Sequence, residues 1–128
     1  METTASFVHH LGVFASDFQA SERFYTAALK ALGIGVGHRA DGVTEYWRPE
    51  WDTPSLSLER AEDTVTRGVH IAFAACSRDA VDAFHAAAVA AGGASRHAPG
   101  TWSEYRAYCA FVSDPDGNNI EAVHKESP

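Results

Sequence analysis

The chain has 128 residues, a formal net charge of −7 at pH 7, and 45% hydrophobic and 21% charged residues, which is typical of one globular domain. The negative charge disfavours nucleic-acid binding, and no apolar run approaches the roughly 20 residues that span a membrane. The first residues, METTASF, lack the basic and apolar segments of a signal peptide, so we expect a cytoplasmic protein.

The chain is predicted to open with a strand and a helix. The segment FVHHLGVFA, residues 7–15, is rich in β-branched and aromatic residues, which favours a strand. Apolar residues then recur at helical spacing over residues 18–32. Ser16 and Gln19 fit a capping box at the start of this helix, and Gly33 fits its end.

Three short strands are expected next, around residues 35–39, 43–49 and 54–60. Glycine, aspartate and proline residues separate these segments, and the last of them alternates apolar and polar side chains at Leu56 and Leu58. This punctuation is typical of an antiparallel meander.

The same pattern then restarts. GVHIAFA, residues 68–74, predicts a strand, Ser77 fits a helix cap, and a helical apolar pattern runs on to Gly92 and Gly93. Three further strands are expected, at residues 94–97, 105–113 and 118–125. The residues Asp-Pro-Asp-Gly at 114–117 fit a tight type I turn between the last two strands.

The two halves of the sequence are related by a constant offset. Residues 10–33 align with residues 70–93 without a gap, and the matches include His10 with His70 and Phe24 with Phe84. The order strand, cap, helix and glycine is the same in both halves. We therefore predict an α+β fold of one domain, residues 1–128, built from two βαβββ modules at residues 7–60 and 68–125.

Three residues are candidate metal ligands. Because neighbouring residues of a strand point to opposite faces, His10 is expected to share a face with Gly12, and His70 with Ala72, away from the bulkier residues that pack on the helices. Glu121 lies in the apolar strand NNIEAV, where a carboxylate is costly to bury unless it is paired, protonated or bound to a metal. Two imidazoles and one carboxylate on one side of a divalent ion leave coordination positions open for catalysis.

The repeat suggests a fourth member of this set. SLSLERA and GNNIEAV align Leu58 with Ile120 and Glu59 with Glu121. Glu59 is therefore a candidate ligand or catalytic base, and Tyr108 a candidate proton donor. Candidate pocket-lining residues are Phe14, Tyr46, Trp47, Trp102, Tyr105 and Arg106.

The other histidines and the cysteines are interpreted as structural. Cys76 and Cys109 have no CxxC spacing and lie in apolar, strand-like segments, which favours small buried hydrophobic residues. The histidines expected at the surface or in the core are His9, His38, His85, His97 and His124.

Three motifs, VHHLGVFASD, GVHIAF and FVSDPDGNNIEAV, together with the duplicated module, resemble the vicinal oxygen chelate superfamily. That superfamily holds glyoxalase I, extradiol dioxygenases, fosfomycin-resistance thiol transferases and bleomycin-resistance binding proteins. The resemblance implies a curled, eight-stranded mixed sheet around a metal cup, often within a homodimer. It places a divalent ion (Fe, Mn, Ni, Co or Zn) on His10, His70 and Glu121, with Glu59 at or near an additional ligand position.

Two departures limit this transfer. Glyoxalase I has an arginine four residues after its first ligand histidine, where this chain has Phe14, and fosfomycin transferases have a threonine two residues after theirs, where it has Gly12. We therefore expect a glyoxalase-like or dioxygenase-like metalloenzyme, a lyase, isomerase or extradiol-type dioxygenase, that binds the vicinal oxygens of a small substrate. The alternative is a metal-free small-molecule binding protein of the bleomycin-resistance type.

Overall fold

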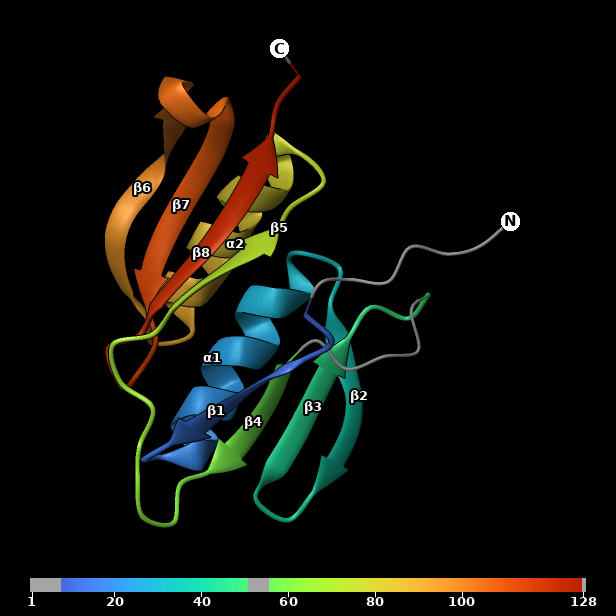
Figure 1. Ribbon diagram of the computed structural model, residues 1–128, viewed down its shortest axis with the longest axis vertical. Coiled ribbons are helices and arrows are strands. Elements are labelled where there is room, and N and C mark those ends of the chain that lie inside the picture. The colour runs from blue at the N-terminus through green and yellow to red at the C-terminus, as the bar shows by residue number, and fades with distance from the viewer. Residues whose placement is uncertain (1–7, 51–55, 128) are drawn as a thin grey trace.

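The computed structural model describes residues 8–50 and 56–127, which fold into eight strands, two α-helices and one short 3₁₀ helix (Figure 1). Residue 7 of the first predicted strand and residues 54–55 of the strand predicted at 54–60 lie outside the described residues. Neither α-helix in the described part of the chain has the length and apolar character needed to cross a bilayer.

The first module contains β1 (Leu11–Ala15), α1 (Phe18–Lys30), β2 (Gly35–Ala40), β3 (Val43–Trp47) and β4 (Leu56–Arg60). Its strands form one sheet in the order β1-β4-β3-β2, in which β1 and β4 are parallel and the other pairs are antiparallel. We call it sheet 1. Helix α1 packs against β4 and β2 of this sheet.

The second module contains β5 (His70–Ala74), α2 (Arg78–Ala90), β6 (Ala94–Trp102), the 3₁₀ helix η1 (Ser103–Tyr105), β7 (Ala107–Ser113) and β8 (Asn119–Lys125). Its strands form sheet 2 in the equivalent order, β5-β8-β7-β6, with β5 and β8 parallel. Helix α2 packs against β6, β7 and β8.

The α+β class is confirmed, with a difference in how the strands assemble. The eight strands form two four-stranded sheets, and no strand pairing joins these sheets within residues 8–50 and 56–127. Figure 1 shows the modules one above the other, with each helix behind strands of its own module. Each sheet thus has one face covered by its helix and a second face that no helix covers, which we call its open face.

Alternating side chains explain which face each helix covers. Val13 and Ala15 of β1 are buried whereas Gly12 and Phe14 are exposed, and β5 repeats this with Ile71 buried. Burial of these apolar side chains beneath the amphipathic helices is the dominant favourable contribution to folding. The core combines both modules because α1 and α2 also pack against each other.

The helix caps agree with the prediction in one module and differ in the other. In α2, Ser77 is the N-cap, and its hydroxyl accepts a hydrogen bond from the backbone N–H of Ala80. In α1 the N-cap is Asp17, whose carboxylate accepts from the backbone N–H of Ala20, so the predicted cap at Ser16 is wrong. The hydroxyl of Ser16 donates to the carboxylate of Asp116 instead.

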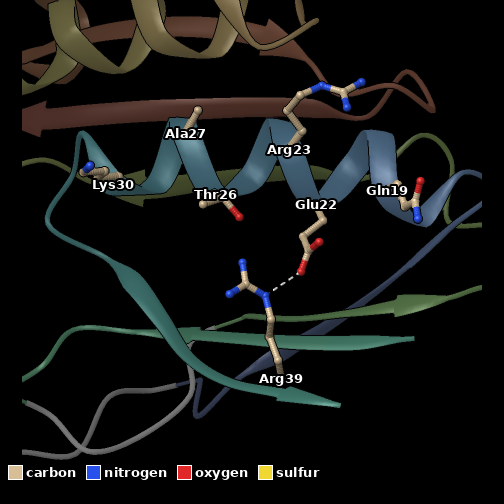
Figure 2. A pocket seen from close by; sticks show the side chains of 7 residues that line it. All are labelled: Gln19, Glu22, Arg23, Thr26, Ala27, Lys30 and Arg39. Atoms are coloured by element: carbon tan, nitrogen blue, oxygen red, sulfur yellow. Dashed lines mark hydrogen bonds and ion pairs between the residues drawn. The ribbon is translucent and has the colours of Figure 1, made fainter. Parts of the chain in front are cut away.

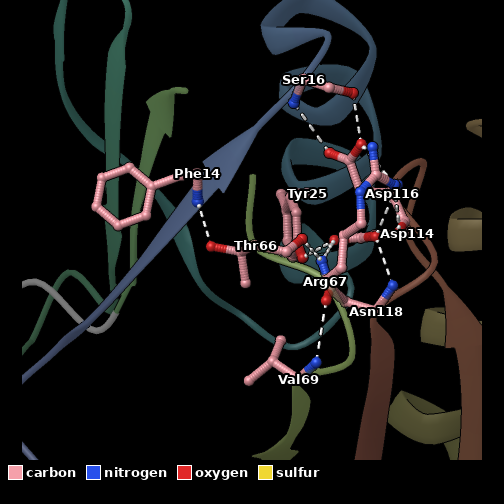
Figure 3. A network of polar contacts seen from close by, with 9 residues as sticks. All are labelled: Phe14, Ser16, Tyr25, Thr66, Arg67, Val69, Asp114, Asp116 and Asn118. Carbon is pink, nitrogen blue, oxygen red and sulfur yellow. Dashed lines mark hydrogen bonds and ion pairs between the residues drawn. The ribbon is translucent and has the colours of Figure 1, made fainter. Parts of the chain in front are cut away.

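A buried polar network joins the modules at the predicted turn (Figure 3). The turn is present, since the backbone N–H of Gly117 donates to the carbonyl of Asp114 at 2.9 Å. Tyr25 of α1 donates its hydroxyl to the Asp114 carboxylate at 2.5 Å, and the amide of Asn118 donates to the same carboxylate and to the carbonyl of Thr66. These bonds tie the β7–β8 turn to the first module and to the segment between the modules.

Candidate functional site

The candidate site begins on the open face of sheet 2. In β5, His70 and Ala72 point to this face because Ile71 and Phe73, which alternate with them, are buried in the core on the opposite face. The strand register places Ala72, Glu121, Phe111 and His97 beside one another in a row across the four strands. The apolar strand around Glu121 predicted that this carboxylate needs a partner, a proton or a metal. Glu121 thus lies in the middle of the open face.

His70 and Glu121 are brought together. Nε2 of His70 lies 2.7 Å from Oε1 of Glu121 and forms a hydrogen bond with it. Glu121 is only 8% exposed, whereas the His70 side chain is half exposed. A carboxylate this deeply buried needs a polar partner, and the imidazole is one.

The thiol of Cys109 is a second partner of Glu121. Burial, with a hydrogen bond from this thiol to Glu121 as the next contribution, raises the pKa of Cys109 to about 12. The thiol is therefore protonated at neutral pH and can donate to the carboxylate. The interpretation of Cys109 as a buried residue agrees with its 4% exposure, but its contact with Glu121 was not foreseen.

Aromatic rings flank the His70–Glu121 pair. The Phe111 ring lies 6.1 Å from the His70 ring and 5.8 Å from the indole of Trp102, between centroids. His97 lies 5.1 Å from Trp102 and 6.1 Å from Phe111. Three strands thus bring four rings into one cluster on the open face. We call Phe111, Trp102 and His97 the ring wall.

The open face of sheet 1 carries the other predicted ligands. His10 precedes β1, is exposed, and has Nδ1 at 2.7 Å from Nδ1 of His9. Glu59 on β4 accepts a hydrogen bond from the Ser57 hydroxyl at 3.2 Å. Phe14 pairs with Glu59 in the β1–β4 register and is 40% exposed.

The strand register changes the expected equivalence of Glu59 and Glu121. Helix caps at positions 17 and 77 confirm the offset of 60 between the modules. With this offset Gly12 corresponds to Ala72; Gly12 pairs with Ser57 and Ala72 pairs with Glu121. Ser57 is therefore the structural equivalent of Glu121, and the predicted equivalence of Glu59 is wrong by two residues.

The structure does not bring His10 to the His70–Glu121 pair. Among the described residues no group of three or more histidine, cysteine, aspartate or glutamate side chains is arranged to hold a metal ion. The pair itself fits a divalent ion chemically, since an imidazole nitrogen and a carboxylate oxygen are common ligands of Zn²⁺ and Fe²⁺. In one chain, His10 and Glu59 therefore lie on the open face of sheet 1, whereas His70 and Glu121 lie on the open face of sheet 2.

Several predicted pocket residues lie elsewhere. Tyr108 faces α2, where its hydroxyl donates to Asp82 at 2.7 Å and its ring lies under the guanidinium of Arg78. Tyr46 is fully buried beneath α1, and burial raises its pKa to about 12. Both tyrosines have the strand parity that faces the helices, so we no longer assign Tyr108 as a proton donor or Tyr46 to the pocket.

The remaining predicted residues are divided between the open faces and the surface. Trp47 lies against Gly37 on the open face of sheet 1, since a Cβ atom at Gly37 would overlap its ring. Trp102 lies in the ring wall. Tyr105 is 63% exposed in η1, and Arg106 follows it with a left-handed φ of 49°. These last two residues lie at the tip of the β6–β7 connection.

The residues that were missed are Phe111, His97 and Cys109. Phe111 and Cys109 have the parity opposite to the buried Ala110 and Val112, so strand alternation could have placed them on the open face. Their position beside Glu121 could not be derived in this way, because it depends on the β7–β8 and β6–β7 registers.

A groove of about 530 Å³ lies along α1 on the first module (Figure 2). Glu22 in this groove pairs with Arg39 at 2.9 Å and accepts from the Thr44 hydroxyl. These hydrogen bonds hold the pKa of Glu22 below its ordinary value. The groove contains none of the predicted site residues; its lining is Gln19, Glu22, Arg23, Thr26, Ala27, Lys30 and Arg39.

Comparison with known proteins gives a family and a fold. Residues 10–123 match the model of the glyoxalase-like domain. A glyoxalase/bleomycin resistance protein from Albidiferax ferrireducens T118 is 35% identical in sequence, and the match covers 94% of this chain and all of that one with a TM-score of 0.82. No curated protein matches the chain.

More distant solved structures share the fold. A lactoylglutathione lyase from Agrobacterium tumefaciens is 21% identical over 95% of this chain and 96% of that one, with a TM-score of 0.66. A glyoxalase-related enzyme from Fulvimarina pelagi is 20% identical over 94% and 89% of the two chains, with a TM-score of 0.72.

Proposed function

Because this chain belongs to the glyoxalase-like domain family, we propose that it is a metal-dependent enzyme acting on a small substrate with two vicinal oxygens. The membership confirms the resemblance to the vicinal oxygen chelate superfamily that the motifs indicated. The observation that carries the proposal is the His70–Glu121 pair, an imidazole and a buried carboxylate 2.7 Å apart on an open sheet face.

The ligands in this proposal are His70, Glu121 and His10. A divalent ion, one of Fe, Mn, Ni, Co or Zn, would supply Lewis-acid stabilisation of negative charge on the substrate oxygens. The protonated thiol of Cys109, which lies beside Glu121, would help to orient this carboxylate, as partners of ligand carboxylates commonly do. The small side chains of Ala72 and Ala74, both exposed beside the pair, leave room for a substrate.

Glu59 is the base that we propose for proton transfer. It is half-buried on the open face of sheet 1, and the Ser57 hydroxyl orients its carboxylate. A carboxylate so held can accept a proton from a carbon or hydroxyl group next to the chelating oxygens, as a lyase or isomerase requires. An extradiol-type dioxygenase needs no such base, so its activity would be unchanged in the Glu59→Gln variant.

We propose that the site is completed by a second copy of the chain, in a homodimer. His10 and Glu59 lie on the open face of sheet 1, and His70 and Glu121 lie on the open face of sheet 2. If the open face of sheet 1 in one protomer lay against the open face of sheet 2 in its partner, His10 and Glu59 of one chain would come close to the histidine and carboxylate pair of the other chain. A two-fold dimer would contain two such sites, since the same contact occurs twice.

The second candidate is a metal-free protein that binds small molecules without reacting. Two observations favour it. The His70–Glu121 hydrogen bond already provides the buried carboxylate with a partner in one chain, and the adjacent ring wall offers apolar contact area to a ligand. On this reading His10 and His70 have no shared role.

Metal analysis of protein purified without a histidine tag or chelator distinguishes the two candidates. We expect about one divalent ion per chain, as a symmetric dimer with two equal sites requires. His70→Ala should lose the ion, and His85→Ala should retain it because His85 hydrogen-bonds Ser95 on the side of α2. If the protein holds no ion after incubation with each of the five metals, the enzyme proposal is wrong and the binding protein is favoured.

A further inference from the structure

We propose that the groove along α1 is a docking site for an acidic segment of a partner protein, which binds in it as an extended chain. The groove contains none of the residues of the candidate metal site. The inference therefore goes beyond the proposed function and depends on neither the metal nor its ligands.

The groove is positively charged in a protein that is negative as a whole. Its lining includes three cations, Arg23, Lys30 and Arg39, and one carboxylate, that of Glu22. The formal charge of the groove is therefore +2, whereas the whole chain carries −7. Because charges are screened beyond about 8 Å at physiological ionic strength, a ligand in the groove interacts mainly with these four side chains. The groove therefore favours an anionic ligand.

These cations can bind a ligand without breaking the fold. The side chains of Arg23 and Lys30 are exposed, and neither has a hydrogen-bond or ion-pair partner within residues 8–50 and 56–127. Arg39 donates its Nε–H to Glu22, and a guanidinium has four further N–H groups. Figure 2 shows the terminal nitrogens of Arg39 directed toward α1, on the side of Thr26. An acidic side chain can therefore form charge-assisted hydrogen bonds with each of the three cations.

The shape of the groove fits a peptide better than a small molecule. Its lining runs along α1 from Gln19 to Lys30, which is about 16 Å at a helical rise of about 1.5 Å per residue. An extended chain covers this length with about five residues. No lining residue is buried, whereas a small-molecule pocket encloses most of the surface of its ligand.

The spacing of the cations also fits an extended acidic chain. Arg23 and Lys30 lie on one face of α1, about two helical turns or 10 Å apart, and the small side chain of Ala27 lies between them. Alternate side chains of an extended peptide point to the same side and are about 6.8 Å apart, so two or three acidic side chains face the groove. A nucleic acid or an anionic membrane would bring many more negative charges toward a chain of net charge −7, which disfavours both.

The probe is fluorescein-labelled octaglutamate, and the neutral control is a labelled glycine–serine peptide of the same length. Binding is measured by fluorescence anisotropy with protein that has been stripped of metal by a chelator, so the result is independent of the metal-dependent function. We expect octaglutamate to bind and the neutral peptide not to bind. The affinity for octaglutamate should fall as the NaCl concentration rises, because salt screens exposed ion pairs.

The test variant is Arg23→Gln combined with Lys30→Gln. The matched control is Arg96→Gln combined with Arg106→Gln, which removes two exposed charges from the second module. Both double variants lower the net charge by two. We expect the test variant to bind octaglutamate about twofold to thirtyfold more weakly than the wild type, the range for two exposed ion pairs, and the control to bind it nearly as tightly as the wild type. Circular dichroism verifies that both fold.

A third variant predicts the opposite effect. Glu22→Gln removes the only negative charge of the groove lining and releases Arg39 from its ion pair. It should therefore bind octaglutamate about twofold to fivefold more tightly than the wild type. Glu62→Gln, which removes an exposed charge outside the groove, should leave the affinity nearly unchanged.

Four results would overturn the docking site. Octaglutamate does not bind, as expected if a second copy of the chain covers the groove; the neutral peptide binds equally well; or the two double variants weaken binding equally. In the fourth, citrate at matched ionic strength displaces labelled octaglutamate as effectively as the unlabelled peptide does, which would indicate a site for small anions. Each of these results leaves the metal-dependent function unaffected, since that function is tested by metal content.

Discussion

Replacing Tyr25 by phenylalanine tests the link between the two modules. The Tyr25 hydroxyl is fully buried and donates to the Asp114 carboxylate at 2.5 Å. Asp114 keeps three other donors, the backbone N–H groups of Asp116 and Asn118 and the side-chain amide of Asn118, each at 2.9 Å. The substitution therefore removes one hydrogen bond to a charged group, worth about 1.5–3 kcal/mol of unfolding free energy, without stranding the carboxylate.

The assay is urea unfolding followed by circular dichroism, with Tyr105→Phe as the matched control. Tyr105 is 63% exposed, so its loss of a hydroxyl should change the unfolding free energy by less than about 0.5 kcal/mol. For a domain of this size we expect Tyr25→Phe to lower Tm by roughly 5–12 °C. Equal stability of the two variants would refute the link between the modules through this network.

The same residue predicts an alkaline effect. Burial, together with the negative charge of Asp114, raises the pKa of Tyr25 well above its ordinary value. The folded state therefore holds a proton that the unfolded chain releases, so the stabilisation is fully present below about pH 10 and falls as the pH rises further. Tyr25→Phe should show a shallower alkaline decline than the wild type, and an unchanged decline would contradict the assignment.

Three further predictions concern packing, acid stability and thiol reactivity. A Cβ atom at Gly93 would lie 2.5 Å from an aromatic ring of α1, whereas one at Gly35 would meet nothing within 4 Å. In urea unfolding, Gly93→Ala should therefore lower the unfolding free energy by about 1–3 kcal/mol, and Gly35→Ala should lower it much less. Similar losses in the two variants would contradict the packing of Gly93. The lowered pKa of Glu22 stabilises the folded protein at pH values above the ordinary pKa of about 4.5, and this stabilisation is lost as the pH falls. The unfolding free energy of Glu22→Gln should therefore fall less on acidification than that of the wild type. In native protein Ellman's reagent should react rapidly with the exposed Cys76 and slowly with the buried Cys109, and fast reaction of both thiols would disagree with the structure.

The order of elements could be predicted from the sequence because local patterns determine it. Helical spacing, the Ser77 cap and the glycine stops identify α2, and the Pro115-containing turn identifies the β7–β8 hairpin. The offset between residues 10 and 70 also matches the two capped helices. These features depend on neighbours within a few positions in the chain.

The strand register could not be predicted in the same way. A shift of two residues keeps every side chain on its face, so Glu59 and Ser57 fit the open face equally well in the sequence. Only the observed pairing of Gly12 with Ser57 separates them. The placement of Tyr108, in contrast, could have been predicted from the sequence. Tyr108 lies two residues before the buried Ala110, so both side chains point to the helix side of sheet 2.

The arrangement of the two modules relative to each other could not be predicted from the sequence either. The apolar pattern predicts one buried face for each sheet, but it does not predict whether the open faces of sheet 1 and sheet 2 in one chain contact each other. In the described residues they do not share a ligand cluster. The homodimer that the resemblance implied stays a prediction, and it is the part of the proposal on which His10 depends.

The most direct test of the shared site is metal binding by a mixture of two variants, His10→Ala and His70→Ala. Each variant alone should lose the divalent ion. In co-expressed protein, random two-fold dimers that combine the variants contain one site with both histidines intact, so the mixture should recover about a quarter of the wild-type metal content. Recovery of no metal in the mixture would contradict a site shared between protomers, since a site within one chain lacks a ligand in both variants.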